Sequence, residues 1–85
     1  MTRQEVFDNL QGVFDSVFIE PVVVTPELAA SDVEEWDSLS HISLVLAVEK
    51  KFGIRFRVGE VEATHNIGDF ADLILRRLEG VPHPA

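Results

Sequence analysis

The chain has 85 residues, no cysteine and a net charge of −8, from fifteen acidic and seven basic side chains. This length allows one small domain, and the lack of cysteine excludes a disulfide framework, a thiolate metal site and a cysteine nucleophile. The acidic balance argues against binding to nucleic acid or to an anionic membrane surface, because both need a basic patch. It fits either partners with basic surfaces or a simple role in solubility.

No segment of the sequence is typical of export or membrane insertion. The N-terminus is polar and periodic, unlike a signal peptide, and the longest apolar run, residues 44–48, is far too short to cross a bilayer. A small fold without disulfides also suits a reducing compartment. We therefore expect a cytoplasmic protein.

The first predicted element is an amphipathic helix over residues 3–18. Thr2 and Glu5 have the spacing of a capping box at its start. Gly12 lies inside the pattern and costs about 1 kcal/mol relative to alanine, which the apolar stripe outweighs. The stripe has helical spacing and consists of Val6, Phe7, Leu10, Val13, Phe14, Val17 and Phe18.

A long acidic loop follows over residues 19–37. Two prolines end the helix, and the valine run at 22–24 has no obvious partner strand, so we expect an extended stretch that packs on the core. Ser31 and Glu34 have the spacing to cap one short helical turn. The acids of this loop are Glu27, Asp32, Glu34, Glu35 and Asp37, with no base among them. A loop this long in a small domain usually carries function.

From Ser38 the pattern is helical again, and Gly53 is a natural helix stop. The apolar band of this helix consists of Leu39, Ile42, Leu44, Val45, Leu46, Val48 and Phe52. It covers more than half of the helix, which should therefore be largely buried or offer an apolar flank to a partner. We expect an extended connector over residues 54–58 and a short turn of helix over residues 59–63.

Asn66 caps the last predicted helix, with Asp69 at the third position. The inner face of this helix consists of Ile67, Phe70, Ala71, Ile74 and Leu78. Residues 1–80 should form the domain and residues 81–85 a flexible tail. The predicted fold is all-α: a small antiparallel bundle of three main helices plus one short helix, with a long first loop.

Ser38 is the residue that most needs an explanation. Aspartate and serine are frequent helix caps, so capping alone would account for Asp37 and Ser38. However, a serine in the first turn also holds its hydroxyl near free backbone N–H groups and the positive end of the helix. That position suits a phosphate ester. The residues alone leave both interpretations open.

The arrangement around Ser38 resembles the acyl carrier proteins of fatty acid and polyketide synthesis. The stretches that match this family are residues 37–39 (DSL), 45–52 (VLAVEKKF), 52–56 (FGIRF) and 66–69 (NIGD). The resemblance runs through the whole chain and is strongest from residue 35 to residue 78. In this family the serine of the Asp-Ser-Leu motif carries 4'-phosphopantetheine.

The resemblance implies that a phosphopantetheinyl transferase moves 4'-phosphopantetheine from coenzyme A to Ser38. The thiol of that group would then hold acyl groups as thioesters. Further partners would be an acyl-loading enzyme, either a ligase or an acyltransferase, and a ketosynthase or another acyl-processing enzyme. The chain would be a monomer and no enzyme. Asp37 would hold the helix start and help to position the transferase, and Leu39 and Ile42 would form the apolar part of a docking patch.

Two features depart from the fatty-acid carriers, whose second helix usually shows several acids to basic enzymes. Residues 40–48 include no acid here, and the acids lie in the preceding loop. Trp36 and His41 are also unusual, although Trp36 is expected mainly to pack the loop onto the core. We predict a docking surface formed by Glu34, Glu35, Trp36, His41 and Ile42. Trp36, directly before the Asp-Ser-Leu motif, makes the chain resemble stand-alone carriers of polyketide or other specialised pathways.

An enzyme and a metal site fit the sequence less well. Asp37, Ser38 and His41 suggest a catalytic triad, but Asp37 is poorly placed to orient the histidine and no Gly-x-Ser-x-Gly motif occurs. His41, His65 and His83 match no metal-ligand spacing, so no metal is expected. The main alternative is a non-catalytic helical interaction module in which Ser38 is only an N-cap.

Overall fold

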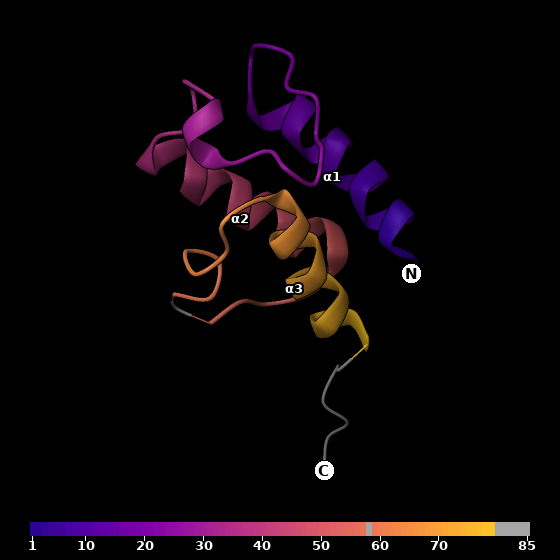
Figure 1. Ribbon diagram of the computed structural model, residues 1–85. Coiled ribbons are helices and arrows are strands. Elements are labelled where there is room, and N and C mark those ends of the chain that lie inside the picture. The colour runs from indigo at the N-terminus through magenta and orange to yellow at the C-terminus, as the bar shows by residue number, and fades with distance from the viewer. Residues whose placement is uncertain (58, 80–85) are drawn as a thin grey trace.

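A computed structural model of the chain describes residues 1–57 and 59–79. The elements in these residues are α1 Arg3–Val17, the 3-10 helix η1 Ala30–Asp32, α2 Ser38–Phe52 and α3 Ile67–Glu79. They contain no strand, and α1 packs against both α2 and α3 (Figure 1). The predicted all-α bundle with a long first loop is therefore confirmed. No helix in the described part of the chain is long and apolar enough to span a membrane.

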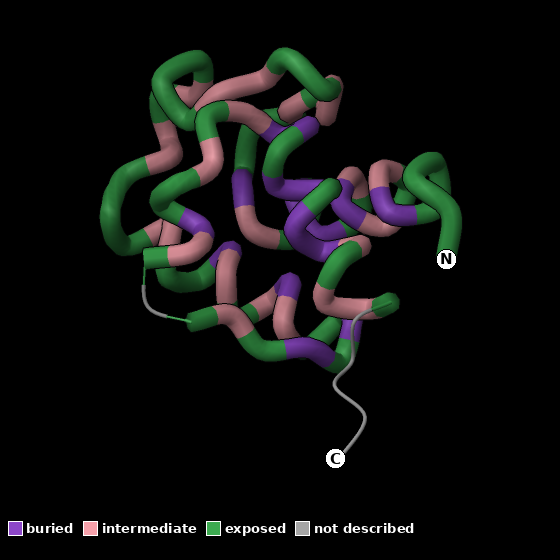
Figure 2. The backbone as a smooth tube through the Cα atoms, turned by 60° about the horizontal axis from the view of Figure 1, so that its bottom comes forward, coloured by how far each residue is buried: buried purple, intermediate pink, exposed green. Residues whose placement is uncertain are grey.

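The core forms where the apolar stripes of the three helices meet, and buried and exposed residues alternate along each helix (Figure 2). Its most deeply buried large side chains are Phe14, Leu10, Leu44, Ile67, Ile74, Val6 and Val48. In α2, however, the apolar band is split between two faces. Leu39, Ile42 and Leu46 are 76, 56 and 61% exposed, so this helix offers an apolar flank to the outside.

The predicted helix ends are confirmed by their capping bonds. The Glu5 N–H donates to Oγ1 of Thr2 at 3.1 Å, and the Thr2 N–H donates to the Glu5 carboxylate at 2.8 Å. At the end of α2, Gly53 adopts the left-handed conformation with φ 68°, and the N–H of Ile54 donates to the Glu49 carbonyl at 3.1 Å. Glycine adopts this conformation at little cost, which explains why α2 stops there.

A short helical turn was predicted both in the first loop and over residues 59–63, and only the one in the first loop is a helix. Residues 59–63 form a hydrogen-bonded turn that begins with Gly59 at φ 85°, which is outside the helical region. The short helix of the first loop is η1. It is not capped by Ser31 with Glu34, because Ser31 lies inside it. The Asp32 carboxylate reaches back and accepts the Ala29 N–H at 3.0 Å. The predicted tail, residues 81–85, lies outside the described residues.

The first half of the long loop is held by one side chain of α1. The Gln11 amide donates to the Val22 carbonyl at 2.7 Å and accepts the Val24 N–H at 2.9 Å. Val22 and Val24 therefore pack against the core, while Val23 is 74% exposed. The predicted extended stretch is confirmed, and Gln11 takes the place of a partner strand.

The second half of the loop is held by the start of α3. The Ile67 N–H donates to the Leu28 carbonyl at 2.8 Å, and the Gly68 N–H donates to the Pro26 carbonyl at 2.9 Å. N–H groups in a first helical turn have no partner within the helix, so the loop satisfies two of them. A Cβ atom at Gly68 would lie 3.1 Å from the Pro26 oxygen, and this close approach favours glycine.

Candidate functional site

Ser38 is the first residue of α2, and its side chain is exposed. Asp37 precedes it as the N-cap, and its carboxylate accepts the Ser40 N–H at 2.8 Å. That hydrogen bond lowers the pKa of the Asp37 carboxyl, so this group is charged at neutral pH. The Ser38 hydroxyl forms no hydrogen bond with any residue that the structure describes. Asp37 is therefore the N-cap, and only that part of the alternative interpretation that made Ser38 the N-cap was wrong.

The first turn of α2 gives the Ser38 hydroxyl a favourable setting for a phosphate ester. The positive end of the helix dipole lies at this turn, and it stabilises negative charge placed nearby. Exposure leaves the oxygen open to a large modifying enzyme. A free hydroxyl beside a separately capped helix start is what covalent attachment at this residue requires.

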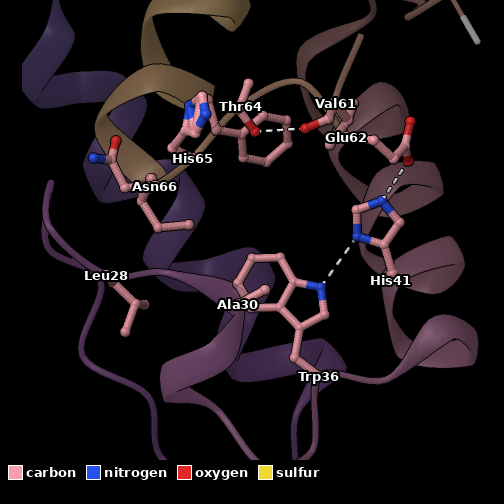
Figure 3. A pocket seen from close by; sticks show the side chains of 11 residues that line it. Leu28, Ala30, Trp36, His41, Val61, Glu62, Thr64, His65 and Asn66 are labelled. Atoms are coloured by element: carbon pink, nitrogen blue, oxygen red, sulfur yellow. Dashed lines mark hydrogen bonds and ion pairs between the residues drawn. The ribbon is translucent and has the colours of Figure 1, made fainter. Parts of the chain in front are cut away.

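Trp36 connects the first loop to α2 and to the turn before α3 (Figure 3). Its indole N–H donates to Nδ1 of His41 at 3.1 Å, and Nε2 of His41 lies 2.7 Å from the Glu62 carboxylate. Because Nδ1 accepts a hydrogen bond, the proton of the neutral ring is on Nε2 and is donated to Glu62. The His41 hydrogen bond in turn lowers the pKa of Glu62. We call these three side chains the Trp36–His41–Glu62 chain.

The Trp36 ring also packs onto the core, as predicted. It lies 5.5 Å from the Phe14 ring, edge to face, and 5.9 Å from the Phe18 ring, measured between ring centroids. Such pairs of aromatic rings stabilise a core beyond the area that they bury. Trp36 therefore joins the first loop to α1 as well as to α2.

A pocket of about 220 Å³ opens beside the Trp36–His41–Glu62 chain (Figure 3). Its apolar wall consists of Leu28, Ala30, Val61, Ile67 and Phe70. Trp36 and His41 border it together with the polar side chains that precede α3. The pocket thus lies where the first loop, the start of α2 and the start of α3 meet.

The residues of the possible triad do not act together. The Asp37 carboxylate binds the Ser40 N–H, while His41 binds Trp36 and Glu62, so no base is hydrogen-bonded to Ser38. The described residues also contain no group of histidine and acidic side chains that could hold a metal ion.

The residues predicted to dock partners fall into two groups. Glu34 and Ile42 are exposed, as is Leu39 next to Ser38. Glu35 instead accepts the N–H groups of Ile19, at 3.2 Å, and Glu20, at 2.8 Å, where the chain leaves α1. Trp36 and His41 are engaged in the Trp36–His41–Glu62 chain. These three partly exposed side chains help to hold the first loop, and their role in docking stays a prediction.

Gln11 and Glu62 were missed by the sequence interpretation. Gln11 was placed on the outer face of the first helix, and a glutamine there gives no sign that it will bind a distant backbone. Glu62 lies 21 residues after His41, and no local pattern links two residues that far apart. Only the packing of the loops reveals either contact.

Comparisons with known proteins agree with this architecture. No family model matches the chain. The chain is 33% identical over 75 residues to an acyl carrier protein of Acidothermus cellulolyticus, covering 87% of this chain and 89% of that protein. It is 29% identical over 85 residues to the meromycolate extension acyl carrier protein of Mycolicibacterium smegmatis, covering 99% and 86%. A solution NMR structure of a holo acyl carrier protein from Geobacter metallireducens matches with a TM-score of 0.80 and 36% identity, covering 94% and 95%.

Proposed function

Because the chain belongs to the acyl carrier protein family, we propose that Ser38 is its attachment residue for 4'-phosphopantetheine. The observation that carries this proposal is the separation of roles at the start of α2. Asp37 caps the helix through Ser40, and the Ser38 hydroxyl is exposed and free of hydrogen bonds to the described residues. Attachment joins Oγ of Ser38 to the phosphorus of the phosphopantetheine group, and the nucleotide part of coenzyme A leaves.

The attached group supplies a thiol that holds acyl groups as thioesters, and the chain contributes a fixed point of attachment. Tethering raises the concentration of the acyl group near a partner's active site. The chain thus acts as a carrier and performs no bond chemistry of its own. The charged Asp37 carboxylate, next to Ser38, would help to position the transferase.

The partners we propose are a phosphopantetheinyl transferase, an acyl-loading enzyme, and a ketosynthase or another acyl-processing enzyme. Leu39 and Ile42 would meet them directly, since both side chains are more than half exposed. Glu34 would add negative charge beside them. A monomeric state and a cytoplasmic location stay predictions from the sequence.

Intact mass spectrometry tests the attachment site. The apo chain is incubated with coenzyme A and a broad-specificity phosphopantetheinyl transferase, beside the variants Ser38→Ala and Ser43→Ala. Ser43 is an exposed serine of the same helix and serves as the matched control. We expect one phosphopantetheine on the native chain and on Ser43→Ala, and none on Ser38→Ala. A native chain that stays unmodified while a known carrier is modified would favour the interaction module instead.

A further inference from the structure

We propose that the enzyme that docks on the exposed face of α2 offers carboxylates to the last turn of the helix, beyond the apolar depression that receives the residues next to Ser38. The face consists of Leu39, Ile42, Leu46 and Lys50, and we call it the α2 docking face. The inference rests on the proposed function, because the face begins beside Ser38.

The α2 docking face is a continuous stripe. Its members are spaced at i, i+3, i+7 and i+11, which places them on one side of a helix. The buried residues of α2, Leu44, Val48 and Phe52, occupy the opposite side. Leu39, Ile42 and Leu46 therefore form an exposed apolar stripe on which a partner can pack.

The charge on this surface changes sign along the helix. Glu34 and Asp37 lie just before its start, and Lys50 and Lys51 lie in its last turn. No acid occurs between Ser40 and Val48. The one acid of the helix, Glu49, accepts the Phe56 N–H at 2.8 Å and so holds the connector.

The two lysines are available to a partner. Within the described part of the chain, neither forms an ion pair, whereas Arg3 pairs with Asp72 and Arg77 pairs with Glu60. Both lysine side chains are exposed. Lysines at a helix C-terminus also interact favourably with the helix dipole, so their presence alone does not require a partner. The test must separate these two roles.

The geometry specifies the partner further. Lys50 follows Ser38 by twelve residues, which corresponds to about 18 Å along the helix axis. An enzyme that fits this face therefore has an apolar depression next to the entrance through which the phosphopantetheine group reaches its active site. It also has a carboxylate about 18 Å away from that entrance. Its basic groups would lie only near the entrance, facing Glu34 and Asp37. An enzyme whose docking surface is basic along the whole length of α2 would place a positive charge opposite Lys50, and this repulsion disfavours binding.

The experiment uses a ketosynthase with a uniformly basic docking site as the probe. The holo chain, confirmed by mass, carries an acyl group, and kcat/KM for its transfer is measured for the native chain, Lys50→Glu and Arg76→Glu. Arg76 is the matched control, because it is an exposed cation in the last turn of α3 and its replacement changes the net charge equally. We expect Lys50→Glu to raise kcat/KM about fivefold or more, mainly through KM, and Arg76→Glu to change it less than twofold.

The second part of the experiment reverses one charge on the enzyme. In an enzyme variant whose basic residue opposite the last turn of α2 is changed to glutamate, the native chain should become the better substrate and Lys50→Glu the worse one. Equal effects of Lys50→Glu and Arg76→Glu would mean that only net charge matters, and the proposal would be wrong. No gain for Lys50→Glu would overturn it as well. Failure of the proposed function is seen separately, because the chain would then never reach the holo mass.

Discussion

The indole N–H of Trp36 donates a hydrogen bond to Nδ1 of His41, 3.1 Å away, and this bond joins the end of the first loop to α2 directly after Ser38. The other ring nitrogen of His41 contacts Glu62 in the turn before α3. Three segments that are separate in the sequence are thus connected beside the proposed attachment site. This chain of contacts helps to hold the first loop against α2 beside Ser38.

Replacing His41 by alanine should loosen the first loop without unfolding the domain. The indole N–H would lose its partner while the Trp36 ring keeps its contacts with Phe14 and Phe18. We expect the free energy of unfolding to fall by about 1 to 2 kcal/mol, because the substitution removes both hydrogen bonds of His41, to Trp36 and to Glu62. Trp36 is the only tryptophan of the chain, so urea unfolding followed by its fluorescence measures the effect directly. Ser43→Ala is the control, and an equal loss for both variants would contradict this role of His41.

A substitution of His41 by glutamate is a poor test of docking alone. The new carboxylate would lie close to Glu62, which now accepts a hydrogen bond from the His41 ring. Like charges at this distance repel each other, so the variant would change stability and docking together. Exposed Glu34, which forms no contact within the Trp36–His41–Glu62 chain, is the better position for testing the charge of the loop.

Glu62 should make the stability of the domain depend on pH in the acidic range. Its pKa is lowered from the usual 4.5 by the His41 hydrogen bond, so the folded state favours the charged carboxylate. The stabilisation is therefore present above about pH 4.5 and is lost as the pH falls through the lower folded-state pKa. Glu62→Gln should be less stable than the native chain at pH 7, and this difference should shrink as the pH falls below about 4.5. Urea unfolding across this range measures the difference, and a difference that grows toward low pH would contradict the assignment.

The helices of this fold could be predicted from the sequence, because their signals are local. The stripes of α1 and α3, the capping pair of Thr2 and Glu5, and the stop at Gly53 each depend on residues within one or two turns. The helical turn predicted over residues 59–63 is not a helix because Gly59 adopts a φ of 85°, a conformation that no local pattern indicates.

The surroundings of the candidate site could be predicted only in part. Asp37, Ser38 and Leu39 form a compact motif, so the sequence was sufficient to find them. Glu35 was predicted as part of a docking surface, and its two hydrogen bonds to the backbone where the chain leaves α1 were not foreseen. A charged side chain on a loop looks the same in a sequence whether it faces solvent or a distant N–H group.

Gln11 should be essential for the shape of the first loop, although it lies on α1. Gln11→Ala removes both hydrogen bonds to the backbone of Val22 and Val24, and we expect a loss of about 1 to 2 kcal/mol. Gln11→Glu keeps the acceptor for the Val24 N–H but places a second oxygen against the Val22 carbonyl, so it should not rescue the loss. Amide hydrogen exchange of Val24 measures the contact. Unchanged protection in both variants would show that other contacts hold this stretch.

Two glycine-to-alanine substitutions should have opposite effects on stability. Gly12 lies inside α1, and a Cβ atom there would meet no atom within 4 Å. Gly12→Ala should therefore raise the free energy of unfolding by about 0.5 to 1 kcal/mol, since alanine loses less backbone entropy in a helix. Gly68 also lies in a helix, but its Cβ atom would lie 3.1 Å from the Pro26 oxygen and 3.3 Å from the Arg3 guanidinium.

For Gly68→Ala we expect a net loss of about 1 kcal/mol, because the loop must move away from α3 and its two hydrogen bonds to the helix start must lengthen. Thermal unfolding of the two variants beside the native chain gives the signs directly. Hydrogen exchange at Ile67 and Gly68 should become faster in Gly68→Ala and stay unchanged in Gly12→Ala. If both variants were stabilised, helix propensity would outweigh the contact between the first loop and α3, and that contact would contribute little to holding the loop beside Ser38.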